Sequence, residues 1–185
     1  MEMQVVHLLT ARRFIELLQG EQITTTVMQL FCEFYQRTYL KRSGHLGYLN
    51  SDFFSLLHAL MAEKLLIMLA KKDHKVIAAT LSLIGDNTLY GRYWGASEEV
   101  DSLHFELCYY QGIEYAIKHN IHCFNAGAQG EHKIARGFQP ITTYSAHHII
   151  HPDFNHAIAD YLKRERQHID IYKQQCSTLL PFKNE

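Results

Sequence analysis

The stretch from Gly127 to Phe138, GAQGEHKIARGF, concentrates polar chemistry directly after a short hydrophobic segment. Its glycines at 127 and 130 allow backbone N–H groups to approach a ligand closely. On a short helix, residues three or four positions apart share a face, and a cationic cluster there binds a carboxylate or a phosphate. This cluster is His132, Lys133 and Arg136. The alternative is a solvated basic turn that pairs with Glu131.

A second loop carries the opposite charge and leads into a predicted helix. Its carboxylates are Glu98, Glu99 and Asp101. A helix N-terminus stabilises a phosphate by roughly 0.3–1 kcal/mol, but a carboxylate about 8 Å away opposes it by on the order of 2 kcal/mol at an effective dielectric of roughly 20. A glycine-rich pyrophosphate turn is also missing, so the loop argues against coenzyme A and favours an amine. The alternative is that these acids are solvated and that Asp101 or Ser102 caps the helix.

Glu106 is the residue whose position most strongly suggests catalysis. On a helical wheel it falls near the middle of an apolar arc, where a carboxylate must be paired, hydrogen-bonded or neutralised. Removal of a proton from an amine would suit such a group. Its expected partner is Arg92, on a predicted strand between Tyr90 and Trp94 on one face. The alternative is a purely structural pair of Arg92 and Glu106. His104 begins the same helix and either reaches the site or faces water.

The sequence favours neither a metal site nor a cysteine nucleophile. The four cysteines, Cys32, Cys108, Cys123 and Cys176, match neither a zinc pattern nor a compact disulfide framework, and no metal is expected. Neither Cys108 nor Cys123 has a neighbouring basic group in the sequence to activate its thiol, so no nucleophile is expected. His147, His148 and His151 lie close together in the sequence, but His147 and His148 would point to opposite faces of a strand, which disfavours a metal site there.

Composition is that of a soluble globular protein. Hydrophobic residues make up 47% of the 185 residues, and a net charge of −1 gives no general attraction to nucleic acid. We expect one domain over 1–185, with a poorly defined segment at about 1–12. No membrane-spanning run and no signal-peptide core are apparent, so the cytoplasm is the expected location.

The hydrophobic periodicity predicts the elements that must position these residues. Strands are expected at 14–19, 65–72, 75–85, 88–96, 121–126 and 140–150. A first helix is expected with Thr24 or Thr25 as its cap, and a second with Ser51 as its cap, running to about 64 with Phe53, Leu56, Leu57 and Leu60 inward. Further helices are expected from about 103 to 119, and from Pro152 with Phe154, Ile158, Tyr161 and Leu162 on one face. A turn and a short helix follow residue 126.

This order predicts an α+β fold with a mixed central sheet flanked by helices, as in a GNAT-type N-acyltransferase domain. Tight turns make strands 65–72, 75–85 and 88–96 an antiparallel meander, and a helical crossover makes strand 121–126 parallel to strand 88–96. The carboxyl ends of those two strands should open on one edge. We therefore expect the acidic and basic loops to share one crevice.

Three long segments of the chain carry a resemblance: YGRYWGASEEVDSLHFELCYYQGIEYAIKHN, GAQGEHKIARGF and TYSAHHI. They resemble a bacterial family of FemAB-like predicted N-acyltransferases linked to peptidoglycan biosynthesis or recognition. The likeness runs from about Ile15 to Lys183 and matches only the C-terminal half of typical members. It implies a GNAT fold and transfer of an aminoacyl group from charged tRNA to a peptidoglycan precursor amine. By motif match it implies roles for Arg92, Trp94, Glu98, His104, Glu106, Gln129, Glu131, His132, Lys133 and Arg136.

These observations lead to an N-acyl- or aminoacyltransferase that acts on a small-molecule or peptide amine. Glu106, His132 and His104 are the expected catalytic residues. Glu98, Glu99 and Glu106 are expected to attract the amine, and His132, Lys133 and Arg136 are expected to hold the anion of the donor or acceptor. No tightly bound cofactor is expected, with acyl-coenzyme A or aminoacyl-tRNA as the co-substrate. The alternatives are a non-catalytic half-domain that binds a cell-wall peptide or small zwitterion, and an acetyl-coenzyme-A-dependent enzyme. The expected partner is a second copy of the chain or a missing N-terminal half-domain.

Overall fold

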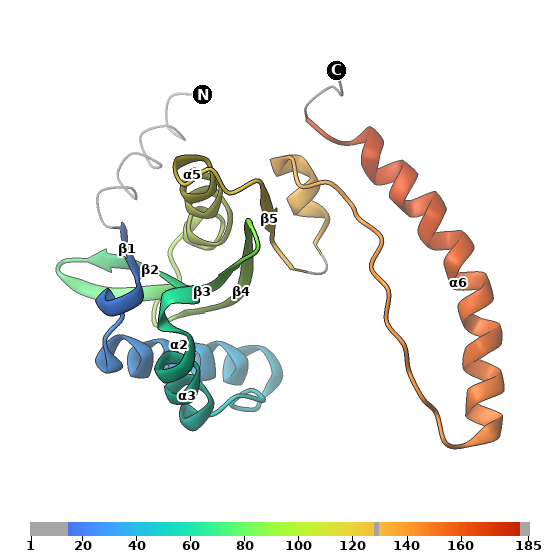
Figure 1. Ribbon diagram of the computed structural model, residues 1–185, viewed down its shortest axis with the longest axis horizontal. Coiled ribbons are helices and arrows are strands. Elements are labelled where there is room, and N and C mark those ends of the chain that lie inside the picture. The colour runs from blue at the N-terminus through green and yellow to red at the C-terminus, as the bar shows by residue number, and fades with distance from the viewer. Residues whose placement is uncertain (1–14, 128–129, 182–185) are drawn as a thin grey trace. The chain divides into compact units, whose positions relative to one another are not determined.

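The computed structural model of the protein describes residues 15–127 and 130–181. The chain divides after Gly127 into two compact units, which are described separately (Figure 1). That residues 1–185 act as one domain stays a prediction. Within the described residues, no helix is long and apolar enough to cross a membrane.

A mixed five-stranded sheet forms the centre of the first unit, as predicted. Its strands are β1 (Ile15–Gln19), β2 (Leu65–Lys72), β3 (Lys75–Gly85), β4 (Thr88–Ala96) and β5 (Cys123–Asn125), and they lie in that order across the sheet. The pairs from β1 to β4 are antiparallel, and β4 pairs with β5 in parallel. Each of the two tight turns of the meander uses a pair of residues with positive φ, Asp73–His74 and Asp86–Asn87, which suits the twist of a hairpin.

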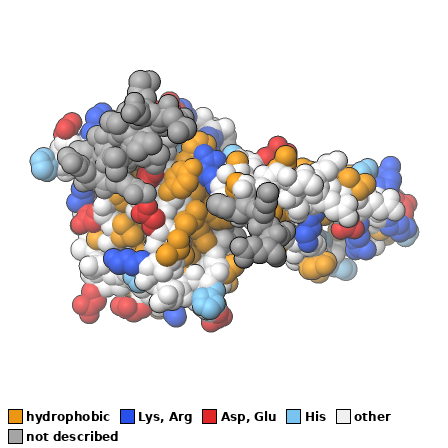
Figure 2. Space-filling view, turned by 90° about the horizontal axis from the view of Figure 1, so that it is seen from above, with side chains coloured by type: hydrophobic (Ala, Val, Ile, Leu, Met, Phe, Trp, Pro, Cys, Tyr) orange, Lys and Arg blue, Asp and Glu red, His pale blue; other side chains and the backbone are white. Residues whose placement is uncertain are grey.

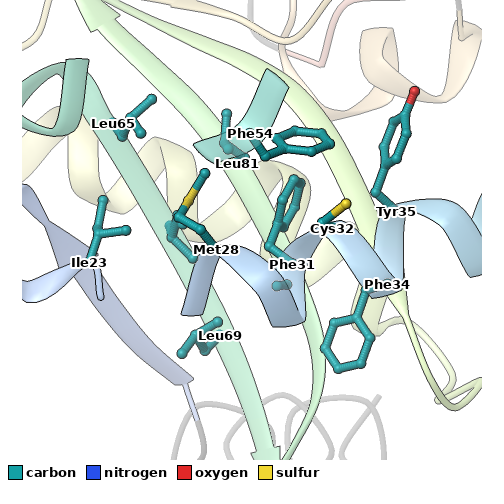
Figure 3. Packing of buried hydrophobic residues seen from close by; sticks show 12 residues of the cluster. Ile23, Met28, Phe31, Cys32, Phe34, Tyr35, Phe54, Leu65, Leu69 and Leu81 are labelled. Carbon is teal, nitrogen blue, oxygen red and sulfur yellow. The ribbon is translucent and has the colours of Figure 1, made fainter. Parts of the chain in front are cut away.

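Two helices cover one face of this sheet, α2 (Thr25–Ser43) and α3 (Ser51–Met61) (Figure 1). The Thr24 side chain caps α2 by accepting a hydrogen bond from the backbone of Val27, as predicted. Phe31 and Phe54 pack edge to face with ring centroids 5.4 Å apart, and they lie over Leu65 and Leu81 of the sheet (Figure 3). This aromatic layer fixes α2 and α3 on the sheet and forms the first core.

The predicted buried face of α3 is wrong. Phe53, Leu56 and Leu60 are exposed, whereas Phe54 is 1% exposed and Leu57 packs beside it at the edge of the core. Asn50, rather than Ser51, caps the helix by accepting a hydrogen bond from the Phe53 backbone at 2.9 Å. The helix therefore contacts the first core through Phe54 and Leu57.

The opposite face of the sheet is covered by one interrupted helix, as Figure 1 shows. It comprises α4 (Leu103–Phe105), a π-helical turn η3 (Glu106–Tyr110) and α5 (Gln111–Lys118). Leu103, Leu107 and Tyr115 of this helix pack on the sheet in a second core. The predicted helix at 103–119 is confirmed, and Asn120 ends it with a φ of 53° as expected. The π-helical turn was not predicted.

The second unit contains a short 3-10 helix η4 (Glu131–Arg136) and the long helix α6 (Pro152–Thr178). The predicted strand at 140–150 is wrong: residues 140–150 contain no strand, and Tyr144 is 93% exposed. A strand needs a neighbour for its backbone hydrogen bonds, which an alternating pattern alone does not supply. Helix α6 begins at Pro152 as predicted, but its apolar residues Phe154, Ile158, Tyr161 and Leu162 are not buried. Figure 2 shows hydrophobic side chains at the surface of both units.

Candidate active site

A bulge in β4 places Arg92. Leu81 of β3 faces Tyr93, and the next residue, Ser82, faces Gly91, so Arg92 is an extra residue in β4. Such a bulge bends the strand and re-aims the side chain. The predicted placement of Tyr90, Arg92 and Trp94 on one face assumed unbroken alternation, which the bulge interrupts.

The parallel strands separate at this bulge. Pairing of β4 with β5 covers only Thr88 to Tyr90, opposite Cys123 to Asn125, although β4 continues to Ala96. A cavity of about 130 Å³ lies beside the unpaired part of β4. Its lining comes from β3, β4, the interrupted helix and the residue after β5, and consists of Thr80, Leu81, Ser82, Gly91, Arg92, Tyr93, Trp94, His104, Cys108, Tyr109 and Ala126.

Two buried hydroxyl groups of β3 line this cavity. Thr80 and Ser82 are 4% and 5% exposed. The Thr80 Oγ1 atom has no hydrogen-bond partner among the residues that the structure describes. A buried hydroxyl without a partner costs on the order of 1–3 kcal/mol and is rare in folded proteins. The cavity therefore holds a hydrogen-bonding group that a ligand could satisfy.

Aromatic rings line the rest of the cavity. The His104 imidazole packs edge to face against Trp94, with ring centroids 5.3 Å apart, and against Tyr109 at 5.7 Å. The sequence left open whether His104 reaches the site or faces water. These ring contacts hold its imidazole against the cavity. Arg92, Trp94 and His104 thus lie together, and each was a candidate site residue.

Glu106 does not line this cavity. It is 3% exposed, and its Oε1 atom accepts a hydrogen bond from Gln111 Nε2 at 2.8 Å. Its Oε2 atom has no hydrogen-bond partner in the described part of the chain. The expected pairing with Arg92 is wrong, because the bulge directs Arg92 to an exposed position on the cavity while Glu106 faces the core. Its burial in the apolar arc was predicted, and its role as a general base stays a prediction.

The acidic loop before α4 is partly neutralised. Glu98 forms an ion pair with Lys72 at 3.1 Å, and Glu99 forms one with Lys41, which holds the pKa of the Glu99 carboxyl below its ordinary value. Neither carboxylate is among the residues that line the cavity. Each lysine reduces the repulsion that we expected these acids to exert on a phosphate. The sequence argument against coenzyme A is weaker for that reason.

The basic cluster lies in the second unit, on η4. Arg136 Nη1 donates a hydrogen bond to the His132 carbonyl oxygen at 2.7 Å, so part of the guanidinium binds its own helix. The Glu131 carboxylate accepts a hydrogen bond from the Tyr172 hydroxyl at 2.9 Å, which raises the pKa of Tyr172 to about 12. Lys133 belongs to the same short helix. Gln129 lies outside the described residues. That the acidic and basic loops share one crevice stays a prediction.

The cavity residues that were not candidates in the sequence include Thr80, Ser82, Cys108 and Tyr109. The hydroxyls of Thr80 and Ser82 could have been found, since they interrupt the otherwise apolar run AATLSLIG on one face of a strand. Cys108 follows His104 by four positions on a helix, a spacing that brings side chains together. The cavity thus combines a cation, an imidazole, a thiol and hydroxyl donors in a small aromatic pocket, which suits a short polar acyl group.

Comparison with solved structures identifies the fold. A possible acetyltransferase from Clostridium difficile 630 superposes with a TM-score of 0.50 at 13% sequence identity, covering 75% of this chain and 99% of that one. An aminoglycoside acetyltransferase from an uncultured soil metagenomic sample, in complex with trehalose, gives a TM-score of 0.48 at 11% identity, covering 74% of this chain and 93% of that one. The fold is that of the GNAT acetyltransferases, as predicted.

Sequence comparison gives a more specific assignment. A search of the curated proteins found no match. A family model described as peptidoglycan biosynthesis/recognition matches residues 7–184, nearly the whole chain. This match over most of the chain shows that the chain belongs to the FemAB-like family.

Proposed function

We propose that the protein is an N-acyltransferase that transfers a short acyl or aminoacyl group to an amine of a peptidoglycan precursor. The observation that carries this proposal is the cavity of about 130 Å³ where β4 and β5 separate, lined by Arg92, Trp94 and His104. The family description and the GNAT fold support the same class of reaction. Ligands of open α/β sheets bind at the carboxyl ends of parallel strands, which is where this cavity opens.

The volume of the cavity limits what it can hold. One water molecule occupies roughly 30 Å³ in the liquid, so about 130 Å³ accommodates a group of a few heavy atoms. The acetyl, glycyl, alanyl and seryl groups are of this size. We assign the acyl group to the cavity and the rest of the donor and the acceptor to the surface around it.

Four of the residues that line the cavity have a proposed role. His104 accepts the proton that the amine loses, because it is the imidazole that faces the cavity. Arg92 is exposed at the cavity mouth and binds an anionic part of the donor or acceptor. The rings of Trp94 and Tyr109 exclude water from the acyl carbon. Catalysis then consists of positioning and proton transfer.

The donor is either acyl-coenzyme A or an aminoacyl-tRNA, and one experiment compares them. The purified chain is incubated with a muropeptide precursor that carries a free lysine or diaminopimelate amine, together with acetyl-coenzyme A or with glycyl-, alanyl- or seryl-tRNA. Mass spectrometry then reads the mass added to the precursor. We expect one donor class to give a product whose added mass sits on the amine.

A binding module is the second candidate, because the family description names recognition beside biosynthesis. Calorimetry with the muropeptide alone separates the two. Binding of the muropeptide without transfer from any of these donors would contradict the transferase and support the binding module. Loss of transfer on Arg92→Ala, with the same muropeptide affinity, would place the defect at the donor.

A further inference from the structure

We propose that Cys108 is a catalytic nucleophile that carries the acyl group as a thioester, with His104 as its proton acceptor. This inference rests on the proposed acyl transfer and adds a covalent intermediate to it. The sequence alone argued against a nucleophile, because no basic residue adjoins Cys108 in the chain. In the fold, both His104 and Cys108 line the same cavity.

The local helix geometry supports the pair. His104 lies in α4 and Cys108 in the π-helical turn η3, four positions later. Residues so spaced on a helix lie on the same side, with Cβ atoms roughly 5–6 Å apart. Single π-helical turns inside α-helices occur often at functional sites, because they reposition one residue relative to the regular helix.

An independent observation points to a ligand in this cavity. Thr80 is 4% exposed, lines the cavity, and its Oγ1 atom has no hydrogen-bond partner within residues 15–127 and 130–181. A hydroxyl that donates to a carbonyl oxygen stabilises the negative charge that develops there during acyl transfer. We assign Thr80 to the carbonyl oxygen of the acyl group that Cys108 attacks.

The reaction balances without an oxidant or a reductant. The Cys108 Sγ atom attacks the acyl carbon while His104 takes the thiol proton, and a bond from sulfur to the acyl carbon forms. The bond from that carbon to the donor sulfur or ribose oxygen breaks, and the leaving group receives the proton from His104. The acceptor nitrogen then attacks the thioester, the bond to sulfur breaks, and the amine proton returns to the Cys108 thiolate through His104.

Cys123 provides a matched control in the same unit. It is exposed on β5, whereas Cys108 is only partly exposed, so accessibility alone would make Cys123 the more reactive thiol. The probe is p-nitrophenyl acetate, a small activated ester that needs no natural donor. Release of p-nitrophenolate gives the rate, and peptide mass spectrometry with hydroxylamine treatment locates the thioester.

We expect Cys108 to be acetylated at least about 10-fold faster than Cys123. Cys108→Ser should abolish the fast phase, and Cys123→Ser should leave it intact. His104→Gln should slow acetylation of Cys108 but not of Cys123. Thr80→Val should slow it too while leaving the unfolding midpoint unchanged or higher, because it removes an unsatisfied hydroxyl and little volume. Equal or faster acetylation of Cys123 would overturn the proposal.

A second measurement separates this inference from the proposed function. If Cys108→Ser transfers the acyl group to the muropeptide amine at the wild-type rate, the thioester is refuted and the N-acyltransferase stands. If wild-type Cys108 accepts the acetyl group but no amine acceptor removes it, the nucleophile stands and the proposed function fails.

Discussion

The side-chain amide of Gln111 donates a hydrogen bond of 2.8 Å to the buried carboxylate of Glu106, across the junction between η3 and α5. Gln111 is 7% exposed and also lies 3.4 Å from the Glu114 carboxylate. Because Glu106 Oε2 has no partner in the described part of the protein, the contact with Gln111 is the main polar compensation for burying this acid. Gln111 therefore supports the helix that carries His104 and Cys108.

Gln111→Ala should lower the free energy of unfolding by about 1–3 kcal/mol, because it leaves both carboxylate oxygens of Glu106 without a donor. Urea denaturation followed by circular dichroism measures the change. Lys118→Ala, at an exposed position on the same helix, is the control and should change stability by less than about 0.5 kcal/mol. Equal stabilities of the two variants would show that the Gln111 contact contributes nothing.

Gly95→Ala should disrupt the packing of α2 on β4. A Cβ atom at Gly95 would lie 2.3 Å from the backbone carbonyl carbon of Phe34, and backbone cannot move aside as a side chain can. We expect a loss of about 1–3 kcal/mol or more. Gly85→Ala, at the end of β3, is the control, because its nearest neighbour is a Tyr90 ring atom at 3.9 Å. A Gly95→Ala protein with the wild-type thermal midpoint would contradict the close helix–sheet contact.

Arg92→Ala should reduce kcat/KM of the proposed transfer by about 10- to 100-fold, as expected when a charged hydrogen bond of roughly 1.5–3 kcal/mol is lost. Arg92→Lys should recover part of the lost kcat/KM if charge alone matters, and little of it if bidentate hydrogen bonding by the planar guanidinium group is required. Arg37→Ala is the control, since Arg37 is exposed on α2, which covers the other face of the sheet. Unchanged kinetics for Arg92→Ala would remove this residue from the site.

The hydroxyl of Tyr172 should titrate at a pH of about 12 in the folded protein. Its hydrogen bond to the Glu131 carboxylate is the main cause, because a negative neighbour disfavours the phenolate, and the neighbouring Cys176 adds to the shift. Since the folded-state pKa exceeds the ordinary value of 10.0, the contribution to stability is complete below pH 10.0 and is lost as the pH rises toward about 12.

Carbon-13 NMR of labelled tyrosines measures this titration, with Tyr172→Phe to assign the signal. Glu131→Gln should move the pKa of Tyr172 down toward 10.0. Glu165→Gln is the control, because it removes the carboxylate that Tyr161 contacts on the same helix and leaves Glu131 in place. A Tyr172 signal that titrates identically in the wild type and in Glu131→Gln would show that the contact does not form in solution.

Much of the first unit was predictable because its signals are local. Strands 65–72, 75–85 and 88–96 lie where the sequence predicts them, since their apolar runs end at turns whose residues tolerate positive φ. Helix α2 begins at its predicted cap, and Glu106 occupies the buried face that the helical wheel indicates. Local backbone preference and periodicity are sufficient for such features.

Predictions failed where an outcome depends on a distant partner. The alternating run at 140–150 resembles a strand, but the described structure supplies no neighbouring strand to pair with it. Glu106 was expected to pair with Arg92, but the bulge that separates them arises from the register of β3 against β4. Cys108 was not expected to be a nucleophile because no basic group adjoins it along the chain, whereas in the fold it lines one cavity with His104 and Thr80.

The order of elements and the tight turns of the first unit are therefore determined by the sequence itself, because each depends on residues within a few positions of one another. The cavity is not determined in this way, because its walls come from β3, β4, α4, η3 and the residue after β5, which meet only in the folded protein. The three-dimensional packing alone places an unsatisfied hydroxyl, an imidazole and a thiol around one small space. The cavity lies beside a one-residue bulge in β4, and such a bulge is a feature of strand register that no local sequence pattern specifies.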